Sequence, residues 1–303
     1  MLRSGAYRKT VEDYVINSFI YLVVIVVFFI TIYPFYYALI VSFNEGMDAS
    51  RGGIFIWPRK ITLENYEHVF SNKQLLQGFK ISTLRTVMGT IISVLFTGAF
   101  AYGLSHYELK FRRTYANIMI FAMYFSGGLI PFFILLRRIG LMDTFGVYII
   151  PSMLTPFNAI IMMSFFREIS PSLRESARID GANDLTIFAK IIIPVSMPVF
   201  ATIALFNGVG HWNNWFDAAY FVTRKELKTV AFWLMELINQ ANITAISGST
   251  QETQHAGTQA AQQFTAESIR MATMIVVVIP IICVYPFLQK YFVKGIMIGS
   301  IKG

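Results

Sequence analysis

Six long apolar runs are the feature of this 303-residue sequence that most restricts its fold. A helix rises about 1.5 Å per residue, so about 20 apolar residues cross a hydrocarbon core of about 30 Å. The runs therefore predict transmembrane helices. They extend over Tyr14 to Phe43, Lys80 to His106, Ala116 to Leu136, Thr144 to Phe166, Val195 to Val222 and Ile269 to Phe292.

The composition agrees with a membrane-embedded chain. Hydrophobic residues make up 55% of the sequence and charged residues only 14%, whereas soluble domains carry about 25% charged residues. The alternative, buried helices of a soluble protein, would need polar faces that these runs lack. We therefore predict an all-α membrane protein with six transmembrane helices.

The first run could instead be a cleaved signal peptide, because Arg3, Arg8 and Lys9 precede it. However, it is much longer than an h-region of about 7 to 15 residues, and no A-x-A-like cleavage site follows it. We expect it to remain as an anchor. The lone Cys283 excludes an internal disulfide, so cysteine chemistry does not indicate the compartment.

The positions of Lys and Arg predict the orientation. With a cytoplasmic N-terminus, six crossings return the C-terminus to the cytoplasm. The prediction is then a cytoplasmic segment at 1–13 and a transmembrane domain at 14–303, with a cytoplasmic loop at 167–194, an outer loop at 223–267 and a cytoplasmic tail at 293–303. The cytoplasmic side holds 13 of the 25 basic residues: Arg3, Arg8, Lys9, Lys110, Arg112, Arg113, Arg167, Arg174, Arg178, Lys190, Lys290, Lys294 and Lys302.

The cytoplasmic loop contains a short charged helix. Ser172 and Glu175 have capping-box spacing, Pro171 suits the first turn, and Gly181 suits the stop. This predicts a helix of about nine residues, about 13 Å long. A second helix should follow and break at Pro194. The wheel of the short helix places Leu173, Ser176, Ala177 and Asp180 on one side, and Arg174, Glu175 and Arg178 on the other.

A known motif lies in the same loop. Glu175, Ser176, Ala177, Gly181, Ile191, Ile193 and Pro194 resemble the E-A-A-x3-G-x9-I-x-L-P loop of bacterial ABC importer permeases. Ser176 replaces the usual alanine and Ile193 the leucine. The alternative is an ordinary solvated loop. The resemblance implies the type I permease fold, with Glu175, Ser176, Ala177, Asp180, Gly181 and Pro194 as the contact that couples the chain to an ATPase.

Other segments extend the resemblance to carbohydrate permeases. "WPRKITLENYEHVF" at 57–70, "WNNWFD" at 212–217 and the ending "LQKYFVKGIMIGSIKG" resemble conserved segments of that family, and the ending resembles the maltose-type second permease. "FSGGLIP" at 125–131 and "RRIGLMD" at 137–143 are similar to the subgroup for complex or acidic oligosaccharides such as alginate. The tail at 294–303 would then contact the ATPase subunits.

The resemblance also implies the partners and the cofactors. Such a permease pairs with a homologous second permease, two cytoplasmic ATPase subunits and an extracytoplasmic binding protein, which in the family contacts an outer loop such as 223–267. ATP and Mg²⁺ would be bound by the ATPase subunits and no cofactor by this chain, which lacks a G-x-x-x-x-G-K-[ST] loop. The location implied is the bacterial inner membrane.

Polar residues inside the predicted helices are candidates for the substrate path, because hydrocarbon penalises them. Trp212 and Trp215 could stack on sugar rings, and Arg85 and Arg270 could attract an acidic sugar. The alternatives are interhelical hydrogen bonds, an interfacial aromatic belt, and pairing of an arginine with an acid such as Glu267. The other candidates are Asn158, Asn207, His211, Asn213, Asn214 and Asp217.

Two other functions fit a membrane chain. A secondary transporter or channel would show intramembrane carboxylates or a polar filter, and Asp217 is the sole acidic candidate. A membrane scaffold would need no coupling loop. The four histidines lack metal-ligand spacing. The pI near 9.5 reflects basic residues at helix ends rather than a nucleic-acid site. In the outer loop, "AFWLMELINQ" predicts an amphipathic helix, followed by a flexible Ser/Thr/Gln/Ala-rich run.

Overall fold

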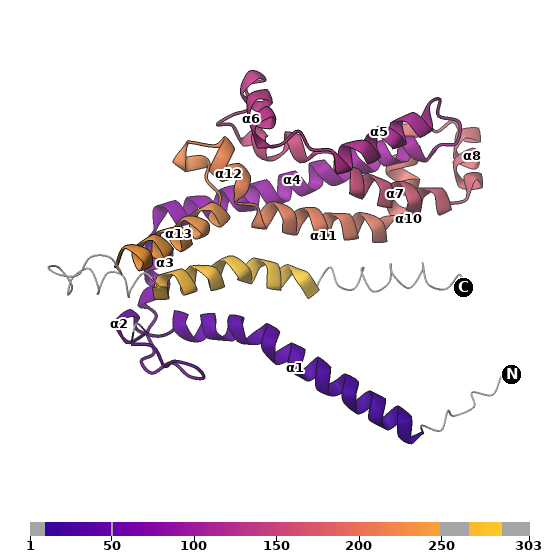
Figure 1. Ribbon diagram of the computed structural model, residues 1–303. Coiled ribbons are helices and arrows are strands. Elements are labelled where there is room, and N and C mark those ends of the chain that lie inside the picture. The colour runs from indigo at the N-terminus through magenta and orange to yellow at the C-terminus, as the bar shows by residue number, and fades with distance from the viewer. Residues whose placement is uncertain (1–9, 50, 249–266, 287–303) are drawn as a thin grey trace. The chain divides into compact units, whose positions relative to one another are not determined.

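The computed structural model describes residues 10–49, 51–248 and 267–286, whose regular elements are helices apart from one isolated antiparallel bridge, Asn44 with Ile61. Two compact units divide the chain: Met1–Val69 with Ala241–Val276, and Phe70–Gln240 with Val277–Gly303. The first unit's described elements are α1 (Val11–Ser42), α2 (Gly46–Ala49), most of α3 (Glu64–Ser71), the end of α13 (Val230–Gly248) and the start of the last helix, Glu267–Pro286 (Figure 1).

The second unit contains the remaining elements. They are α4 (Lys73–Ser105), α5 (Arg112–Tyr124), α6 (Leu129–Arg138), η1 (Phe145–Tyr148), η2 (Ile150–Ser152), α7 (Pro156–Glu168), α8 (Pro171–Ile179), α9 (Asp184–Ile187), the π turn η3 (Phe188–Ile192), α10 (Ile193–Val195), α11 (Met197–Asn213), α12 (Phe216–Phe221), η4 (Lys225–Leu227), the first part of α13 (Val230–Gly248) and the end of the last helix.

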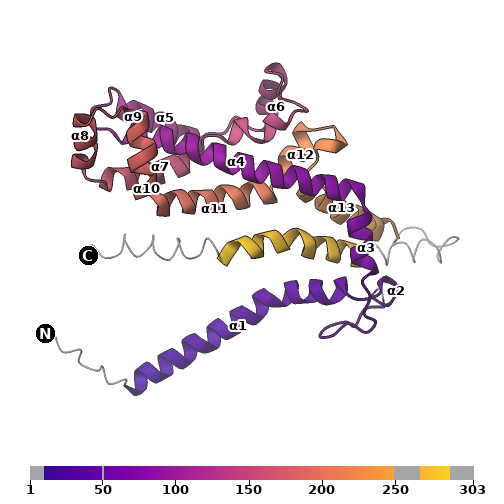
Figure 2. The same cartoon turned by 180° about the vertical axis from the view of Figure 1, so that it is seen from behind.

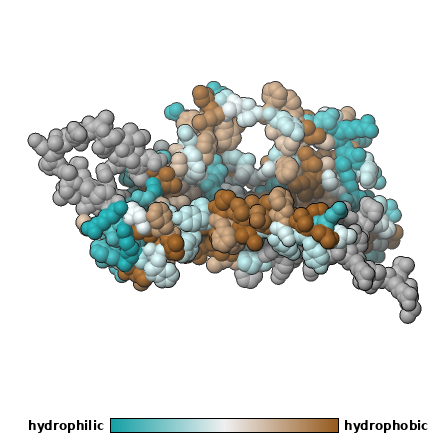
Figure 3. All heavy atoms as spheres, turned by 60° about the horizontal axis from the view of Figure 1, so that its bottom comes forward, coloured by the Kyte–Doolittle hydropathy of each residue, from teal (hydrophilic) through white to brown (hydrophobic). Residues whose placement is uncertain are grey.

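In the first unit, α1 begins with a complete capping box. The Thr10 side chain accepts from the Asp13 N–H, and the Asp13 carboxylate accepts from the Thr10 N–H at 2.7 Å, so two orphan donors of the first turn are satisfied. Its most apolar window has a mean hydropathy of 2.7 and no buried residue. Brown apolar side chains follow the middle of this helix in Figure 3. Such a helix requires an apolar environment.

The second unit is built around α4. This helix runs beside α11 and α7, as both Figures 1 and 2 show. Small residues permit the close approach: a Cβ on Gly98 would lie 2.8 Å from the Phe200 ring, and one on Gly89 would lie 2.7 Å from His211 Nε2. Glycines at these positions let helices pack closely where lipid supplies no hydrophobic driving force between them.

Within the described residues, three helices are long and apolar enough to cross a membrane, and there are up to six crossings if each bent helix pair counts as one. The three are α1, α4 and the last helix. The bent pairs are α5 with α6 (115°), the 3₁₀ segment Phe145–Ser152 with α7 (47°), and Asp184–Val195 with α11 (86°). The α5–α6 break lies between Tyr124 and Leu129, where Gly128 has φ +82°.

The expected fifth run, Val195 to Val222, differs most from the structure. It is divided: α11 ends at Asn213, and α12 begins at Phe216. The Asn214 side chain explains the break, because its Oδ1 accepts from the backbone N–H of Asp217 at 3.1 Å and so starts a new helix. Hydropathy alone does not reveal this restart.

The predicted helix in the outer loop is present, because α13 contains the whole of "AFWLMELINQ". Three predictions lie wholly or largely outside the described residues. They are the N-terminal segment at 1–13, of which residues 1–9 are not described, the Ser/Thr/Gln/Ala-rich run, and the tail at 293–303.

Candidate functional site

The predicted short helix of the loop at 167–194 is present as α8, with Pro171 in its first turn. It ends in a Schellman motif: the Ala182 N–H donates to Ala177 O at 2.9 Å, and the Gly181 N–H donates to Arg178 O at 3.0 Å. Gly181 has φ +80°, which glycine adopts at no steric cost. The predicted capping box of Ser172 and Glu175 is wrong, because the N-cap residue is Ser170 and its side chain makes no capping hydrogen bond.

Arg174 holds α8 against the rest of the unit. Its Nη2 donates to Phe166 O at 3.0 Å and to Ser105 Oγ at 3.2 Å, and the guanidinium lies 5.2 Å from the centre of the Tyr102 ring. Arg174 therefore shares the inward face with Ala177, the only buried residue of α8. The helical-wheel assignment of Arg174 to the opposite side is wrong, because residues three apart are neighbours on a helix.

The opposite face of α8 is exposed. Glu175, Ser176 and Asp180 are exposed, and the apolar Leu173 and Ile179 are 41% and 85% exposed. Within the described part of the chain, the Glu175 carboxylate makes no hydrogen bond or ion pair. This mixed charged and apolar face is suited to binding another protein.

Three short helical segments, α9, η3 and α10, connect α8 to α11. The Asn183 side chain caps α9, accepting from the Thr186 N–H at 2.8 Å, and the π turn η3 leads into α10. Pro194 lies inside α10, and the chain bends only at Ser196, so the predicted break at Pro194 is placed two residues too early. A proline requires the preceding turn to widen to avoid its ring, and the π turn supplies the extra space.

Arg85 and Asp217 form an ion pair in which the arginine is buried and the carboxylate is partly exposed. Arg85 lies in α4 and is 1% exposed, and its Nη2 contacts Asp217 Oδ2 from α12. Its Nη1 donates to Asn214 O at 3.0 Å, and its guanidinium lies 4.5 Å from the centre of the Tyr148 ring. The pair fixes α12 to α4. This geometry favours the structural alternative for Arg85, since its charge is already matched by a carboxylate.

A second polar contact joins three helices. Asn158 of α7 donates to Asn207 Oδ1 at 2.8 Å, and Asn207 of α11 donates to Ser93 Oγ of α4 at 2.8 Å. Asn158 is 4% exposed. Such interhelical hydrogen bonds hold membrane helices together, which is the alternative stated for these residues.

The remaining path candidates on α11 and after it have different surroundings. His211 is buried against Gly89. Trp212 is buried, and its Nε1 donates to Val277 O of the last helix at 3.0 Å. A largely apolar cavity of about 510 Å³ opens beside Trp212 between α4, α11 and the last helix. Asn213 is exposed and Trp215 is half-buried.

Arg270 makes the other expected contact. Its Nη2 lies 3.2 Å from Glu267 Oε1, one turn earlier in the same helix. This is the pairing named as the alternative to an anion-binding role. It is a surface pair of modest strength.

Asp217 also lines an open pocket. The pocket has a volume of about 600 Å³ and includes the Ser126–Gly128 break together with the Phe132, Phe216 and Phe221 rings. A carboxylate that accepts hydrogen bonds beside aromatic faces is suited to a hydroxyl-bearing ligand. In the described part of the chain, no group of three His, Cys, Asp or Glu residues could hold a metal ion.

Sequence reasoning missed Arg174 and the partner of Arg85. Arg174 could have been found from its spacing to Ala177 on an inward face. The members of the Arg85–Asp217 pair are 132 positions apart in the sequence, so the pair carries no local signal beyond the cost of leaving either charge alone in the membrane.

Comparison with known proteins identifies similar chains along nearly the whole length. A family model described as "Binding-protein-dependent transport system inner membrane component" matches residues 3–298. Protein LplC of Bacillus subtilis (strain 168) is 37% identical over 274 residues, 90% of each chain. The polygalacturonan/rhamnogalacturonan transport system permease protein YtcP of the same organism is 35% identical, covering 90% of this chain and 93% of that protein.

A solved structure is similar as well. It is a bacterial ABC transporter involved in the import of the acidic polysaccharide alginate, and one of its chains aligns with a TM-score of 0.84 and 29% sequence identity. The alignment covers 94% of this chain and 99% of that chain.

Proposed function

Because this chain belongs to the family of binding-protein-dependent transport system inner membrane components, we propose that it is the permease subunit of an ATP-driven importer of oligosaccharides or polysaccharides. The observation that carries the proposal is α8, a short helix held by Arg174 on one side and exposed on the other. A secondary transporter, a channel or a scaffold has no use for such a docking element.

The exposed face of α8 is the proposed contact with the ATPase. Glu175 supplies an unpaired charge for a polar contact, with Ser176, Ala177 and Asp180 on the same short helix. Gly181 forms the turn that ends it, and the segment around Pro194 leads back to α11. ATP-driven closure of the ATPase subunits would move α8 as a rigid body together with the ends of α4 and α7, to which Arg174 ties it.

The orientation follows from this assignment. Twenty residues of α4 separate Arg85 from Ser105, which is about 30 Å and matches the hydrocarbon core. With α8 in the cytoplasm, the Arg85 cluster lies at the outer boundary, and six crossings place both termini in the cytoplasm. Cysteines at Ser4 and Lys302 should resist labelling from outside intact cells, and efficient labelling of either would overturn the topology.

An acidic substrate is the finer part of the proposal. Support comes from the alginate importer and from the polygalacturonan/rhamnogalacturonan permease, whose named substrates include acidic polysaccharides. The remaining polar candidates, Asn158, Asn207, His211, Asn213 and Asn214, and the aromatic Trp212 and Trp215, are proposed to border the path. Arg270 stays a candidate for attracting an anion, because its pair with Glu267 is exposed and readily exchanged.

The proposed partners are a homologous second permease, two ATPase subunits that bind ATP and Mg²⁺, and an extracytoplasmic binding protein. This chain would bind no cofactor and hydrolyse no ATP. The tail at 294–303 is proposed to contact the ATPase subunits, and deleting Gly299 to Gly303 should then impair assembly or basal ATPase control.

Co-purification tests the whole assignment. The chain is tagged, expressed together with its genomic neighbours and purified in mild detergent. Co-elution of an ATPase and of a second permease is expected. Elution of this chain alone, with full transport activity in vesicles, would support a secondary transporter or channel, and elution alone without transport would support a scaffold.

A further inference from the structure

The segment that follows α1 is a closely tied loop. Phe43 and Thr62 are paired by a backbone hydrogen bond of 2.8 Å, and Glu45 and Lys60 by one of 3.0 Å and by an ion pair of 2.7 Å. Asn65, 2% exposed, donates to both Ser42 O and Asn44 O at 2.9 Å. The base of the loop is therefore held to the end of α1 on both sides.

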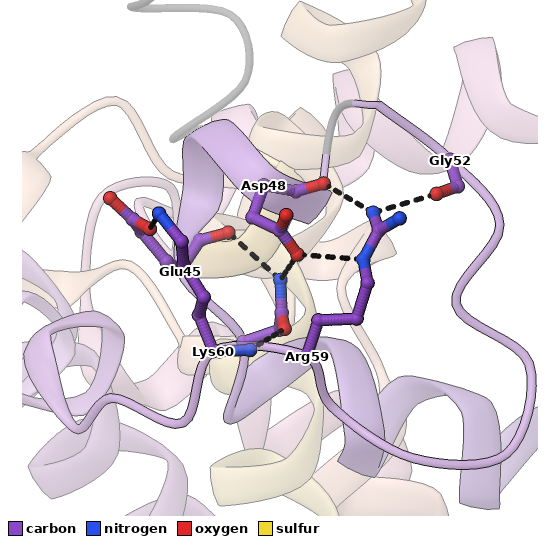
Figure 4. A network of polar contacts seen from close by, with 6 residues as sticks. Glu45, Asp48, Gly52, Arg59 and Lys60 are labelled. Carbon is purple, nitrogen blue, oxygen red and sulfur yellow. Dashed lines mark hydrogen bonds and ion pairs between the residues drawn. The ribbon is translucent and has the colours of Figure 1, made fainter.

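A charged network fixes the interior of the loop, as Figure 4 shows. Arg59 Nε donates to Asp48 Oδ2 at 3.0 Å, and Arg59 Nη2 donates to Asp48 O at 2.9 Å and Gly52 O at 2.8 Å. The Asn44 amide donates to the same Asp48 oxygen at 3.0 Å. The bond from Asn44 and the Arg59 charge hold the pKa of the Asp48 carboxyl below its usual value. The carboxylate thus stays ionised and keeps its contacts with Asn44 and Arg59.

The tip of this loop, Phe55–Trp57, is apolar and exposed. Phe55, Ile56 and Trp57 are 63%, 74% and 68% exposed, whereas the adjoining Ile54 is 4% exposed. Three consecutive large apolar side chains held outward by a rigid loop need an apolar or interfacial surface to contact.

One hydrogen bond gives the depth of the tip. The Tyr36 hydroxyl donates to Ile56 O at 2.7 Å. Tyr36 lies six residues before Ser42, the last residue of α1, so the tip turns back about 9 Å along the helix. It lies beside apolar turns of a candidate membrane-spanning helix, while the Asp48–Arg59 network belongs to the polar base.

We propose that the Phe55–Trp57 tip inserts into the boundary between lipid headgroups and acyl chains and anchors the Ser42 end of α1 at a fixed depth. The headgroup region is about 5–8 Å thick on each side of a bilayer, so a tip about 9 Å back from the end of the helix reaches the acyl boundary. Trp and Tyr are enriched at this level. The occupant is lipid rather than protein, because Ile32 and Tyr33, on the turn of α1 before Tyr36, are themselves exposed apolar side chains of a candidate membrane-spanning helix.

The length of α1 leaves its depth in the membrane undetermined, and the proposed anchor would fix that depth. Its 32 residues correspond to about 48 Å of helix, although about 20 residues suffice to cross the hydrocarbon. A helix this long can slide or tilt to hide any part of its apolar surface. The Phe55–Trp57 tip, tied to one end of α1, would favour one depth of the helix in the membrane. The proposal requires only that α1 crosses the membrane, so it stands apart from the assignment of α8.

Spin-label accessibility in the assembled transporter tests the anchor. The complex is reconstituted in lipid nanodiscs on a Cys283→Ser background, with a spin label at Phe55→Cys and, as a matched control, at Arg51→Cys, an exposed polar position of the same loop. Collision rates are measured with oxygen, which enters lipid, and with a water-soluble nickel chelate. Trp57→Cys replaces Phe55→Cys if that variant does not assemble.

The ratio of the oxygen collision rate to the nickel collision rate should be several-fold higher for the label at position 55 than for the label at position 51. Arg59→Gln, which removes three bonds from the network, should shift the position 55 label toward nickel. Equal nickel accessibility at both positions would place the tip in water and overturn the proposal. Protection of position 55 from both reagents, or protection that appears only when a binding protein is added, would make the tip a protein contact and overturn it equally.

Discussion

The two ends of α4 differ in how their polar groups are used. Near Arg85 the charges are matched within the chain: the buried Arg85 pairs with Asp217, and Asn214 accepts from the same guanidinium. At the Ser105 end, Arg174 and Arg178 have partners, but Glu175 on the same short helix is exposed without a partner in the described part of the chain. In Figure 1, α12 lies near one end of α4 and α8 near the other.

We interpret this difference as one between residues that stabilise the fold and residues that are available to contact a partner. A buried charge must be matched within the chain, because leaving it alone in a low dielectric is costly. An exposed charge on a rigid helix costs little and stays available. Variants at the Arg85 end should therefore damage folding and assembly, whereas variants on the outer face of α8 should damage coupling in a folded complex.

The largest effect is expected at Arg85. Arg85→Gln leaves the Asp217 carboxylate without its cation; breaking a fully buried pair costs about 3–5 kcal/mol, and the partial exposure of Asp217 lowers this cost. Thermal unfolding of the purified complex should occur at a much lower temperature, whereas Arg85→Met combined with Asp217→Leu should recover most of the loss. The result that would contradict this is normal assembly and stability with selective loss of acidic oligosaccharide uptake, because Arg85 would then belong to the substrate path. Arg270→Gln serves for comparison, because Arg270 is only partly buried and pairs with the exposed Glu267.

A smaller effect is expected at Arg174. Arg174→Gln removes charged hydrogen bonds to Phe166 O and Ser105 Oγ, each worth about 1.5–3 kcal/mol. Amide hydrogen exchange across α8 should become faster, and coupled ATP hydrolysis should weaken. Arg178→Gln is the control, because the Arg178–Asp184 pair is exposed and contributes about 0–1 kcal/mol. Equal exchange in the two variants would mean that Arg174 does not hold α8.

The turn at Gly181 should be sensitive to a single methyl group. No atom lies within 4 Å of the position of a new Cβ, so the cost of Gly181→Ala comes from its φ of +80° alone, about 1–2 kcal/mol. Gly103→Ala is matched, with equally open space but an ordinary helical backbone. We expect reduced substrate-stimulated ATP hydrolysis only for Gly181→Ala. Equal rates in both variants would show that the Schellman turn does not position α8.

The smallest effect concerns Asp143, in the connection before η1. Its carboxylate accepts from the Thr223 hydroxyl and from the backbone N–H groups of Thr223 and Arg224, and these bonds lower the pKa of Asp143 from 3.8. A carboxyl whose pKa is lower in the folded than in the unfolded state stabilises the fold at pH values above its unfolded-state pKa. This stabilisation is lost as the pH falls through the folded-state pKa. Exchange of the Thr223 and Arg224 amides should therefore accelerate below about pH 3.8, and Asp143→Asn should lack this acid-dependent step. An identical pH profile in the variant would contradict the assignment.

Local features were predictable from the sequence. Apolar runs indicated α1, α4 and the last helix, and the pattern ending at Gly181 indicated α8 and its stop. Each of these depends on residues a few positions apart. Hydropathy, proline and glycine positions report such short-range constraints directly.

Long-range pairing was not predictable in the same way. Arg85 and Asp217 both stood out as polar residues in apolar runs, but nothing local indicated that they meet. The restart at Asn214, the π turn before Pro194 and the inward face of Arg174 also depend on tertiary contacts. The sequence therefore identified the exposed helix α8 more completely than the Arg85 cluster, since only α8 is a local motif.

Substrate-stimulated ATP hydrolysis by the reconstituted complex tests the central claim most directly. Glu175→Lys reverses the charge on the exposed face of α8 and should lower the stimulation strongly, with membrane insertion and complex assembly unchanged. Glu108→Lys, a reversal at another exposed glutamate of the same end of the second unit, should leave the stimulation at the wild-type level. Wild-type stimulation in Glu175→Lys, or an equal loss in both variants, would contradict the assignment of α8 as the contact with the ATPase.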